Sequence, residues 1–146
     1  MAVTAAWYGL ALKAACNGEW IWGTSVKVAL MTGYTPAQDT EDYWNDISAS
    51  EVSGTGYTAG GQALASPTST YTGATNILAL DAADISWAAS IISATYAVLY
   101  YNTGTASTSA LLGFINFGGT VASNNSTFTI TWAAAGILKL TAAAEA

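Results

Sequence analysis

The feature that most constrains this chain is a repeated alternation of apolar and polar residues with a period of two. It is clearest in STFTITW at 126–132, where Phe128, Ile130 and Trp132 alternate with threonines. Successive side chains of a β-strand point to opposite faces, so this pattern predicts strands with one buried face. The same alternation is found in VKVALM at 26–31, IISATYAVLYY at 91–101 and GILKLTA at 136–142.

Runs rich in Gly, Asn, Ser, Thr and Ala separate these segments, at 102–109, 118–126 and 133–136. Such runs favour turns, and strands at this spacing favour an antiparallel β-sandwich or a small barrel. Residues 67–146 are therefore predicted to hold the main run of strands. The chain has 146 residues and shows no linker or internal repeat, which predicts a single all-β domain over 1–146.

One short helix is predicted ahead of the strands, over Thr4–Cys16. Thr4 can cap its start, and the Ala and Leu residues that follow favour the helical conformation. Its apolar face, which includes Trp7, is expected to pack on the sheet; contact with a neighbouring subunit is the alternative. Cys16 is the single cysteine, so no disulfide can form within the chain, and it is expected to be a small buried apolar residue.

Residues 33–66 lack strand periodicity and are longer than an ordinary connection, which predicts an irregular loop or arm. This segment carries Tyr43, Trp44 and Tyr57. Aromatic residues in an irregular segment either attach it to its own core or lie at the centre of a protein interface. These three residues and Trp7 are therefore the candidate interface anchors.

Five of the nine acidic residues lie within thirteen positions of this loop. Hard cations need clustered oxygen ligands, so Asp39, Glu41, Asp42 and Asp46 are candidate calcium ligands, although their spacing does not fit an EF-hand. Paired carboxylates also hydrolyse glycosides, and a glycan hydrolase would use Asp42 or Asp46. A solvated acidic loop explains the same residues, and we predict no metal and no cofactor.

Missing residues argue against most catalytic machinery. The chain has no histidine, which excludes Ser-His-Asp and Cys-His sites and the common zinc sites. GTGYTAGG at 54–61 lacks the third glycine of the dinucleotide fingerprint and the lysine of a P-loop. Its glycines are expected instead to let the chain bend or lie flat against a partner. We therefore predict that the protein is not an enzyme.

The charge content narrows the class of partner. Only 8% of the residues are charged, the net charge is -6, and three lysines are the only basic residues. Nucleic acids and anionic membrane surfaces both require clustered basic side chains, so neither is a predicted partner. No apolar run reaches the length of a spanning helix, and the N-terminus lacks the pattern of a signal peptide. An uncharged surface of Ser, Thr and Asn suits an assembly.

The sequence VKVALMTGYTPAQDTEDYWNDISASEVSGTGYTAGG at 26–61 resembles a family of small virion proteins of tailed bacteriophages. YAVLYY at 96–101, LLGFINFG at 111–118 and FTITWAAAGILKLT at 128–141 are similar to closing strands of the same family. The resemblance implies a structural component of the particle and no catalytic residues. The expected role is a capsid decoration (cement) protein that binds the major capsid protein and bridges capsomers.

This role implies a location on the outer surface of the capsid, after synthesis in the cytoplasm of the bacterial host. It also implies a homo-oligomer, with a trimer expected by analogy with other all-β decoration proteins. Two alternatives stay open. One is a head fibre, whisker or tail-associated structural protein. The other is a carbohydrate-binding module that attaches the particle to its host.

Overall fold

The computed structural model describes residues 2–145, and the predicted all-β class is confirmed, with 47% of residues in strands and 12% in helices. The elements are β1 (Ala2–Val3), β2 (Ala6–Trp7), α1 (Gly9–Cys16), β3 (Val26–Met31), α2 (Trp44–Ile47), a 3-10 turn (Ser48–Ser50), β4 (Gln62–Ala63), β5 (Thr68–Thr72), β6 (Ile77–Asp81), β7 (Ile85–Tyr101), a second 3-10 turn (Ala106–Thr108), β8 (Leu111–Trp132) and β9 (Leu138–Thr141).

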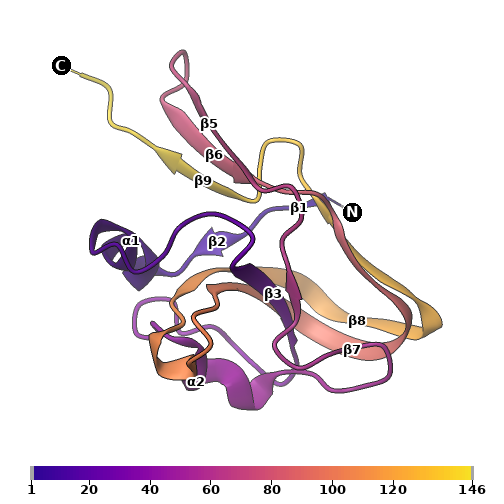
Figure 1. The fold of residues 1–146 in the computed structure, drawn as a ribbon. Helices are drawn as coiled ribbons and strands as arrows, with labels where there is room; N and C mark the ends of the chain where they lie inside the picture. Colours follow the sequence, from indigo (N-terminus) through magenta and orange to yellow (C-terminus); the bar gives the residue numbers. More distant parts are fainter. Residues whose placement is uncertain (1, 146) are drawn as a thin grey trace.

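These strands form two sheets (Figure 1). The larger sheet has the order β1-β8-β7-β3-β4, with β2 also paired to β8, and the smaller has the order β5-β6-β9. Side chains of both sheets meet in one cluster, because Leu80 and Leu138 of the smaller sheet pack with Val26 and Leu112 of the larger one. The predicted strands at 26–31 and 126–132 lie inside β3 and β8.

The long antiparallel hairpin of β7 and β8 is strongly bent. β8 pairs with Ala6 at Phe114 and with Val3 at Trp132. In a straight strand these two β8 positions would lie about 60 Å apart. Val3 and Ala6 are close neighbours in sequence, so β8 must curl back for both to reach it, as Figure 1 shows. The N-terminal strands therefore hold the bend closed.

A bulge of β8 opposite Thr95 changes which side chains of β7 face the main core. The pairing with β8 shifts between Ala94 and Tyr96. Before the shift Ile92 and Ala94 lie in the main core, and after it Ala97 and Leu99 do. Here four residues of β8, 117–120, stand opposite the single residue Thr95 of β7. This irregularity moves the side-chain alternation of β7 to the opposite face of the sheet. An unbroken alternation through 91–101, as the sequence predicts, is therefore wrong.

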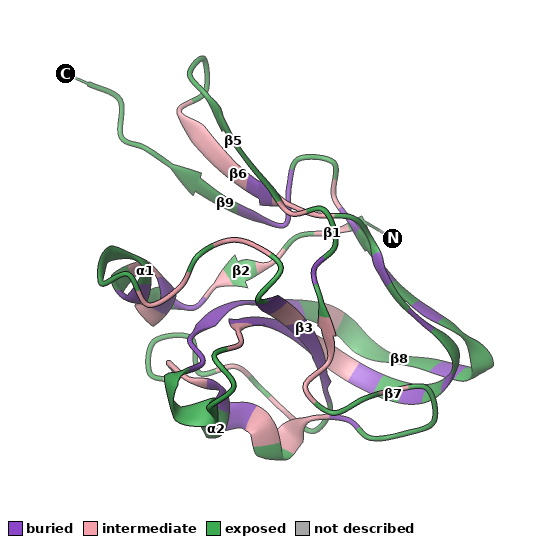
Figure 2. Ribbon diagram, in the orientation of Figure 1, coloured by how far each residue is buried: buried purple, intermediate pink, exposed green. Residues whose placement is uncertain are grey.

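The centre of the larger sheet is covered on both faces (Figure 2). Val26, Val28 and Leu30 of β3 point into the main core, whereas Ala29 and Met31 point into a second cluster with residues of α1 and α2. Residues 33–66, predicted as a loop or arm, contain α2 and β4 and return to this sheet. Backbone bonds from Val52 to Leu30 and from Leu64 to Val26 fix the segment to its own domain.

The N-terminal helix is shorter than predicted. It begins at Gly9, after Tyr8 as the N-cap residue, and not at Thr4, because Ala2–Val3 and Ala6–Trp7 pair with β8 as strands. Cys16 is exposed, which corrects the expectation that it is buried.

Of the three predicted turn regions, those at 102–109 and 133–136 do connect strands. The prediction of a turn at 118–126 is wrong, since these residues form a bulged part of β8.

Candidate functional site

The acidic loop begins with a chain of hydroxyl hydrogen bonds. The Tyr34 hydroxyl donates to Glu41 Oε2 at 2.6 Å, and the Ala37 N–H donates to the same oxygen at 3.0 Å. The proton of Tyr34 is used there, so the buried Tyr8 hydroxyl is the donor in the bond that joins Tyr8 to Tyr34. Burial raises the pKa of both tyrosines, which keeps them as neutral donors.

A second carboxylate, that of Asp46, caps the start of α2 (Trp44–Ile47). Asp46 Oδ2 accepts the backbone N–H groups of Asp42 and Tyr43 at 3.1 and 3.3 Å, across the first turn of α2. A carboxylate in this position satisfies donors that the helix itself leaves free. Desolvation, followed by the hydrogen bond and charge of Asp46, raises the pKa of Asp42. Asp42 and Asp46 therefore fix the conformation of the loop where it enters α2.

A third carboxylate fastens the loop to the sheet. Glu51 Oε1 accepts the Tyr57 hydroxyl at 2.7 Å and the Gly60 N–H at 2.6 Å. The Tyr57 oxygen in turn accepts the Leu30 N–H at 3.1 Å, and the Tyr100 hydroxyl donates to the Gly60 carbonyl at 2.7 Å. Burial raises the pKa of Tyr100 to about 12 and raises that of Tyr57 further. The Leu30 backbone of β3 and the Tyr100 side chain of β7 thus hold the glycine-rich run in place.

The glycines of this run allow close contact with the strands beneath. A Cβ atom on Gly54 would lie 2.2 Å from the Ile91 carbonyl oxygen, and one on Gly61 would lie 1.9 Å from the Val28 carbonyl oxygen. Both distances are far below van der Waals contact, so only glycine fits. The glycine-rich run does lie flat against a surface, as predicted, but that surface is β7 and β3 of its own chain.

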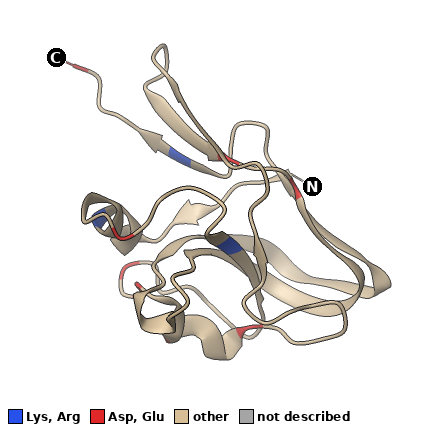
Figure 3. Ribbon diagram, viewed as in Figure 1, with Lys and Arg blue, Asp and Glu red and all other residues tan. Residues whose placement is uncertain are grey.

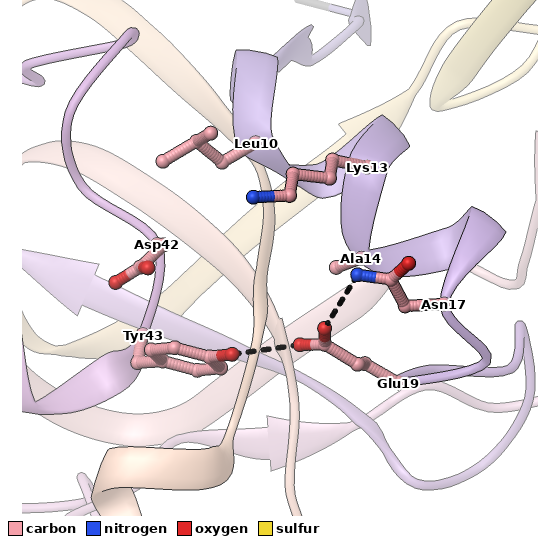
Figure 4. A pocket seen from close by; sticks show the side chains of 7 residues that line it. All are labelled: Leu10, Lys13, Ala14, Asn17, Glu19, Asp42 and Tyr43. Carbon is pink, nitrogen blue, oxygen red and sulfur yellow. Dashed lines mark hydrogen bonds between the residues drawn. The ribbon is translucent and has the colours of Figure 1, made fainter.

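A small hollow separates the acidic loop from the end of α1 (Figure 4). Its volume is about 80 Å³. Glu19 accepts the Tyr43 hydroxyl at 2.7 Å and the Asn17 amide at 3.2 Å, and the Tyr43 bond is the main reason that the pKa of Glu19 is lowered. Lys13 extends over the hollow from α1. Ligand pockets usually measure about 300–1,000 Å³, so this hollow by itself is below that range. Glu19 and Tyr43 also line a more open hollow of about 360 Å³ with Thr103 and Thr108.

The four calcium candidates do not form one site. Asp39, Glu41, Asp42 and Asp46 are spread along the loop, and among residues 2–145 no three His, Cys, Asp or Glu side chains are grouped to hold a metal ion. Asp46, one of the two carboxylates considered for the glycan-hydrolase alternative, accepts the backbone N–H groups of Asp42 and Tyr43 just before α2. None of the helices within this part of the chain is long and apolar enough to cross a membrane.

The four candidate anchors have different surroundings. Trp44 is 9% exposed and stacks on Tyr100, with ring centroids 4.3 Å apart and planes 12° apart. Tyr57 is half-buried under the glycine run, and Tyr43 is half-buried with its hydroxyl on Glu19. These three aromatics thus make contacts inside the domain. Trp7 lies in β2, half-buried, and lines an open groove.

This apolar groove separates α1 and the residues that follow it from the smaller sheet. Its volume is about 370 Å³. It is lined by Trp7, Leu12, Ala15, Trp20, Ile21, Trp22, Ser69, Leu78, Leu80 and Leu140. None of these residues is charged, Ile21 is 70% exposed, and Leu140 is 42% exposed. The groove therefore presents apolar side chains directly to solvent.

Three tryptophans are held rigidly in this groove. The indole N–H groups of Trp7, Trp20 and Trp22 donate to the backbone carbonyls of Lys139, Ala11 and Asp81. Their polar atoms are thus satisfied inside the protein, while the rings remain part of the groove. Sequence reasoning identified only the first of the three. The signal that was available is EWIW at 19–22, a dense apolar run with no helical or strand periodicity.

The charged residues lie on the other strands, the helices and the loops, outside the long hairpin itself (Figure 3). No charged residue occurs from Ile85 to Trp132, which spans all of β7 and β8.

Comparisons with known proteins identify no relative of this chain. No protein-family model matches the chain, and neither curated proteins nor solved structures give a match.

Proposed function

We propose that this protein is a non-enzymatic structural component of a phage particle. In this role it binds the outside of the capsid as a cement protein and bridges capsomers. The observation that carries the proposal is the uncharged groove with its three tryptophans and the 70% exposed Ile21. Exposed apolar clusters of this kind commonly mark protein interaction sites. The resemblance of residues 26–61 to phage virion proteins supplies the partner class, the major capsid protein.

The mechanism is mechanical. Packaged DNA presses outward on a phage head, and a protein that buries surface across the junction of two capsomers opposes their separation. A standard interface buries on the order of 1,600 Å² in total. Repetition over many copies makes the sum large even where each contact is modest. A net charge of -6 with three lysines also suits a position outside the shell, away from the DNA.

The location and copy number on purified particles test this function. Quantitative mass spectrometry and cryo-microscopy should find hundreds of copies distributed over the head. A few copies at one vertex or along the tail would contradict the cement role and favour the fibre, whisker or tail alternative.

The contact surface is tested with a matched pair of variants. Ile21→Asp places a charge in the groove, whereas Val121→Asp places one at another exposed apolar position, 42% exposed on β8. We expect the first variant to lose occupancy on particles and the second to keep it, while circular dichroism shows both folded. Equal occupancy of the two variants would mean that the groove does not contact the capsid.

A further inference from the structure

The two edge strands of the smaller sheet, β5 and β9, differ in how far other parts of the chain cover their free backbone groups. At β9, the Ala5 N–H donates to the Ile137 carbonyl and the Trp7 indole donates to the Lys139 carbonyl, both at 2.7 Å. The N-terminal segment therefore covers that edge. At the other edge, all five residues of β5 are exposed, and among residues 2–145 the strand pairs only with β6.

The backbone direction in β5 follows from the bonds of its neighbour. The carbonyls of Leu80 and Asn76 in and beside β6 accept bonds from the β9 segment. Backbone groups alternate between the two sides of a strand, so Ala79 directs its own groups towards β5. In β5, the same alternation makes Ser69 and Tyr71 direct their N–H and C=O groups away from β6, into solvent.

This open edge lacks the usual protection against pairing. Proteins commonly block an exposed edge with charged residues, proline, bulges or very short strands. The edge strands β1 and β4 of the larger sheet have two residues each. β5 has five residues, TSTYT, without a charge or a proline. An edge of this kind accepts a further strand through backbone hydrogen bonds.

We propose that two copies of this protein pair through β5, antiparallel about a two-fold axis at Thr70, to form one six-stranded sheet. This register uses all five residues and stops before Pro67, which has no N–H to donate. It sets Ser69 opposite Tyr71 of the second copy, so the outward backbone groups of both bond each other. It also sets Thr70 opposite Thr70, and Thr–Thr pairs across strands are favourable.

The same register covers exposed apolar surface. Tyr71 is 55% exposed and follows Leu78 and Leu140 in one cross-strand row of the smaller sheet. Pairing places Tyr71 beside Ser69 of the second copy, and Ser69 lies at the rim of the apolar groove. The two-fold pair therefore extends the apolar face across both copies. This inference concerns the edge of the sheet and does not rest on attachment to a capsid.

A disulfide trap tests the register. Thr70 and its counterpart would be a non-hydrogen-bonded antiparallel pair with Cα atoms about 4.5 Å apart, within the range that a disulfide bridges. In a Cys16→Ser background, which removes the exposed native thiol, Thr70→Cys should give a covalent dimer on mild oxidation. Thr141→Cys, at the β9 edge, is the control and should form no covalent dimer. A Thr70→Cys variant that forms no covalent dimer, or equal cross-linking of both variants, would overturn the proposal.

A charge variant tests whether the edge holds the native dimer. Thr70→Lys sets two ammonium groups opposite each other, and like charges in that position oppose pairing. Thr127→Lys adds the same charge at an exposed position of β8. Light scattering should give a dimer mass for the natural protein and for Thr127→Lys, and a monomer mass for Thr70→Lys. A natural protein that is monomeric or trimeric, or a dimeric Thr70→Lys variant, would contradict the two-fold edge.

Discussion

At the scale of single residues, two tryptophans of the main core differ in one hydrogen bond. Trp132 is 5% exposed and its indole donates to the Ala83 carbonyl at 3.1 Å, whereas Trp87 is 2% exposed and its indole finds no acceptor among residues 2–145. We predict that Trp132→Phe lowers the free energy of unfolding by about 1 kcal/mol more than Trp87→Phe, because only the first change removes a bond. Chemical denaturation followed by circular dichroism measures the difference. An equal loss would show that the bond adds no stability.

Two tyrosines of the loop also make a matched pair. The Tyr57 hydroxyl lies between the Leu30 N–H and Glu51, so Tyr57→Phe leaves a buried N–H unpaired. We predict a loss of about 1–3 kcal/mol in the free energy of unfolding. Tyr43→Phe removes a hydroxyl that bonds the exposed end of Glu19, and it should be nearly neutral. A neutral Tyr57→Phe would mean that this residue does not hold the loop on the sheet.

At the scale of elements, the glycine-rich run depends on close backbone contact with β3. Gly61 has a φ of 72°, and a Cβ there would lie 1.9 Å from the Val28 carbonyl oxygen. We predict that Gly61→Ala costs at least about 2 kcal/mol of unfolding free energy, since the run must lift from the strand. Gly73→Ala, where a Cβ meets nothing within 4 Å, is the control and should be neutral. Thermal melts compare the two, and similar melting temperatures would refute the prediction.

At the scale of the whole molecule, buried tyrosines make the fold sensitive to high pH. Burial raises the pKa of Tyr100 to about 12 and raises the pKa of Tyr8, Tyr34 and Tyr57 above their ordinary value of 10.0. A raised folded pKa gives stability that is complete below the unfolded pKa and lost as pH rises through the folded pKa. We predict that stability falls from about pH 10 to 12 and beyond.

Denaturation at a series of alkaline pH values measures this fall, with phenolate absorbance recorded in parallel. Ionisation of the buried tyrosines should accompany unfolding. Ionisation of the whole set in a protein of unchanged stability would contradict the role of burial.

Much of the fold could be predicted because alternation is a local property of the sequence. The segments around Val28 and Ile130 alternate without interruption, and both form strands. The start of α1 could not be predicted, because Thr4 is a suitable helix cap by its local sequence, but Ala6 and Trp7 pair with β8, more than a hundred positions away. The bulge at Ala94 was also hidden, since it depends on extra residues in the partner strand.

The candidate site was less predictable than the fold. The acidic and aromatic residues of the loop could be identified from the sequence, but their partners are distant in sequence. Trp44 stacks on Tyr100, and the Tyr43 hydroxyl donates a hydrogen bond to Glu19. The apolar groove beside Trp20 and Ile21 could not be predicted from the sequence, because its other wall is formed by residues of β6 and β9.

By itself, the sequence determined the all-β class, the absence of histidine-dependent catalytic and zinc sites, and the low charge. These are properties of the composition and of the local alternation of apolar and polar residues. Only the tertiary structure decided which carboxylates hold the loop, which tryptophans line a groove and which strand edge is open. Each of those outcomes depends on contacts between segments far apart in the chain, and a local pattern carries no information about such contacts.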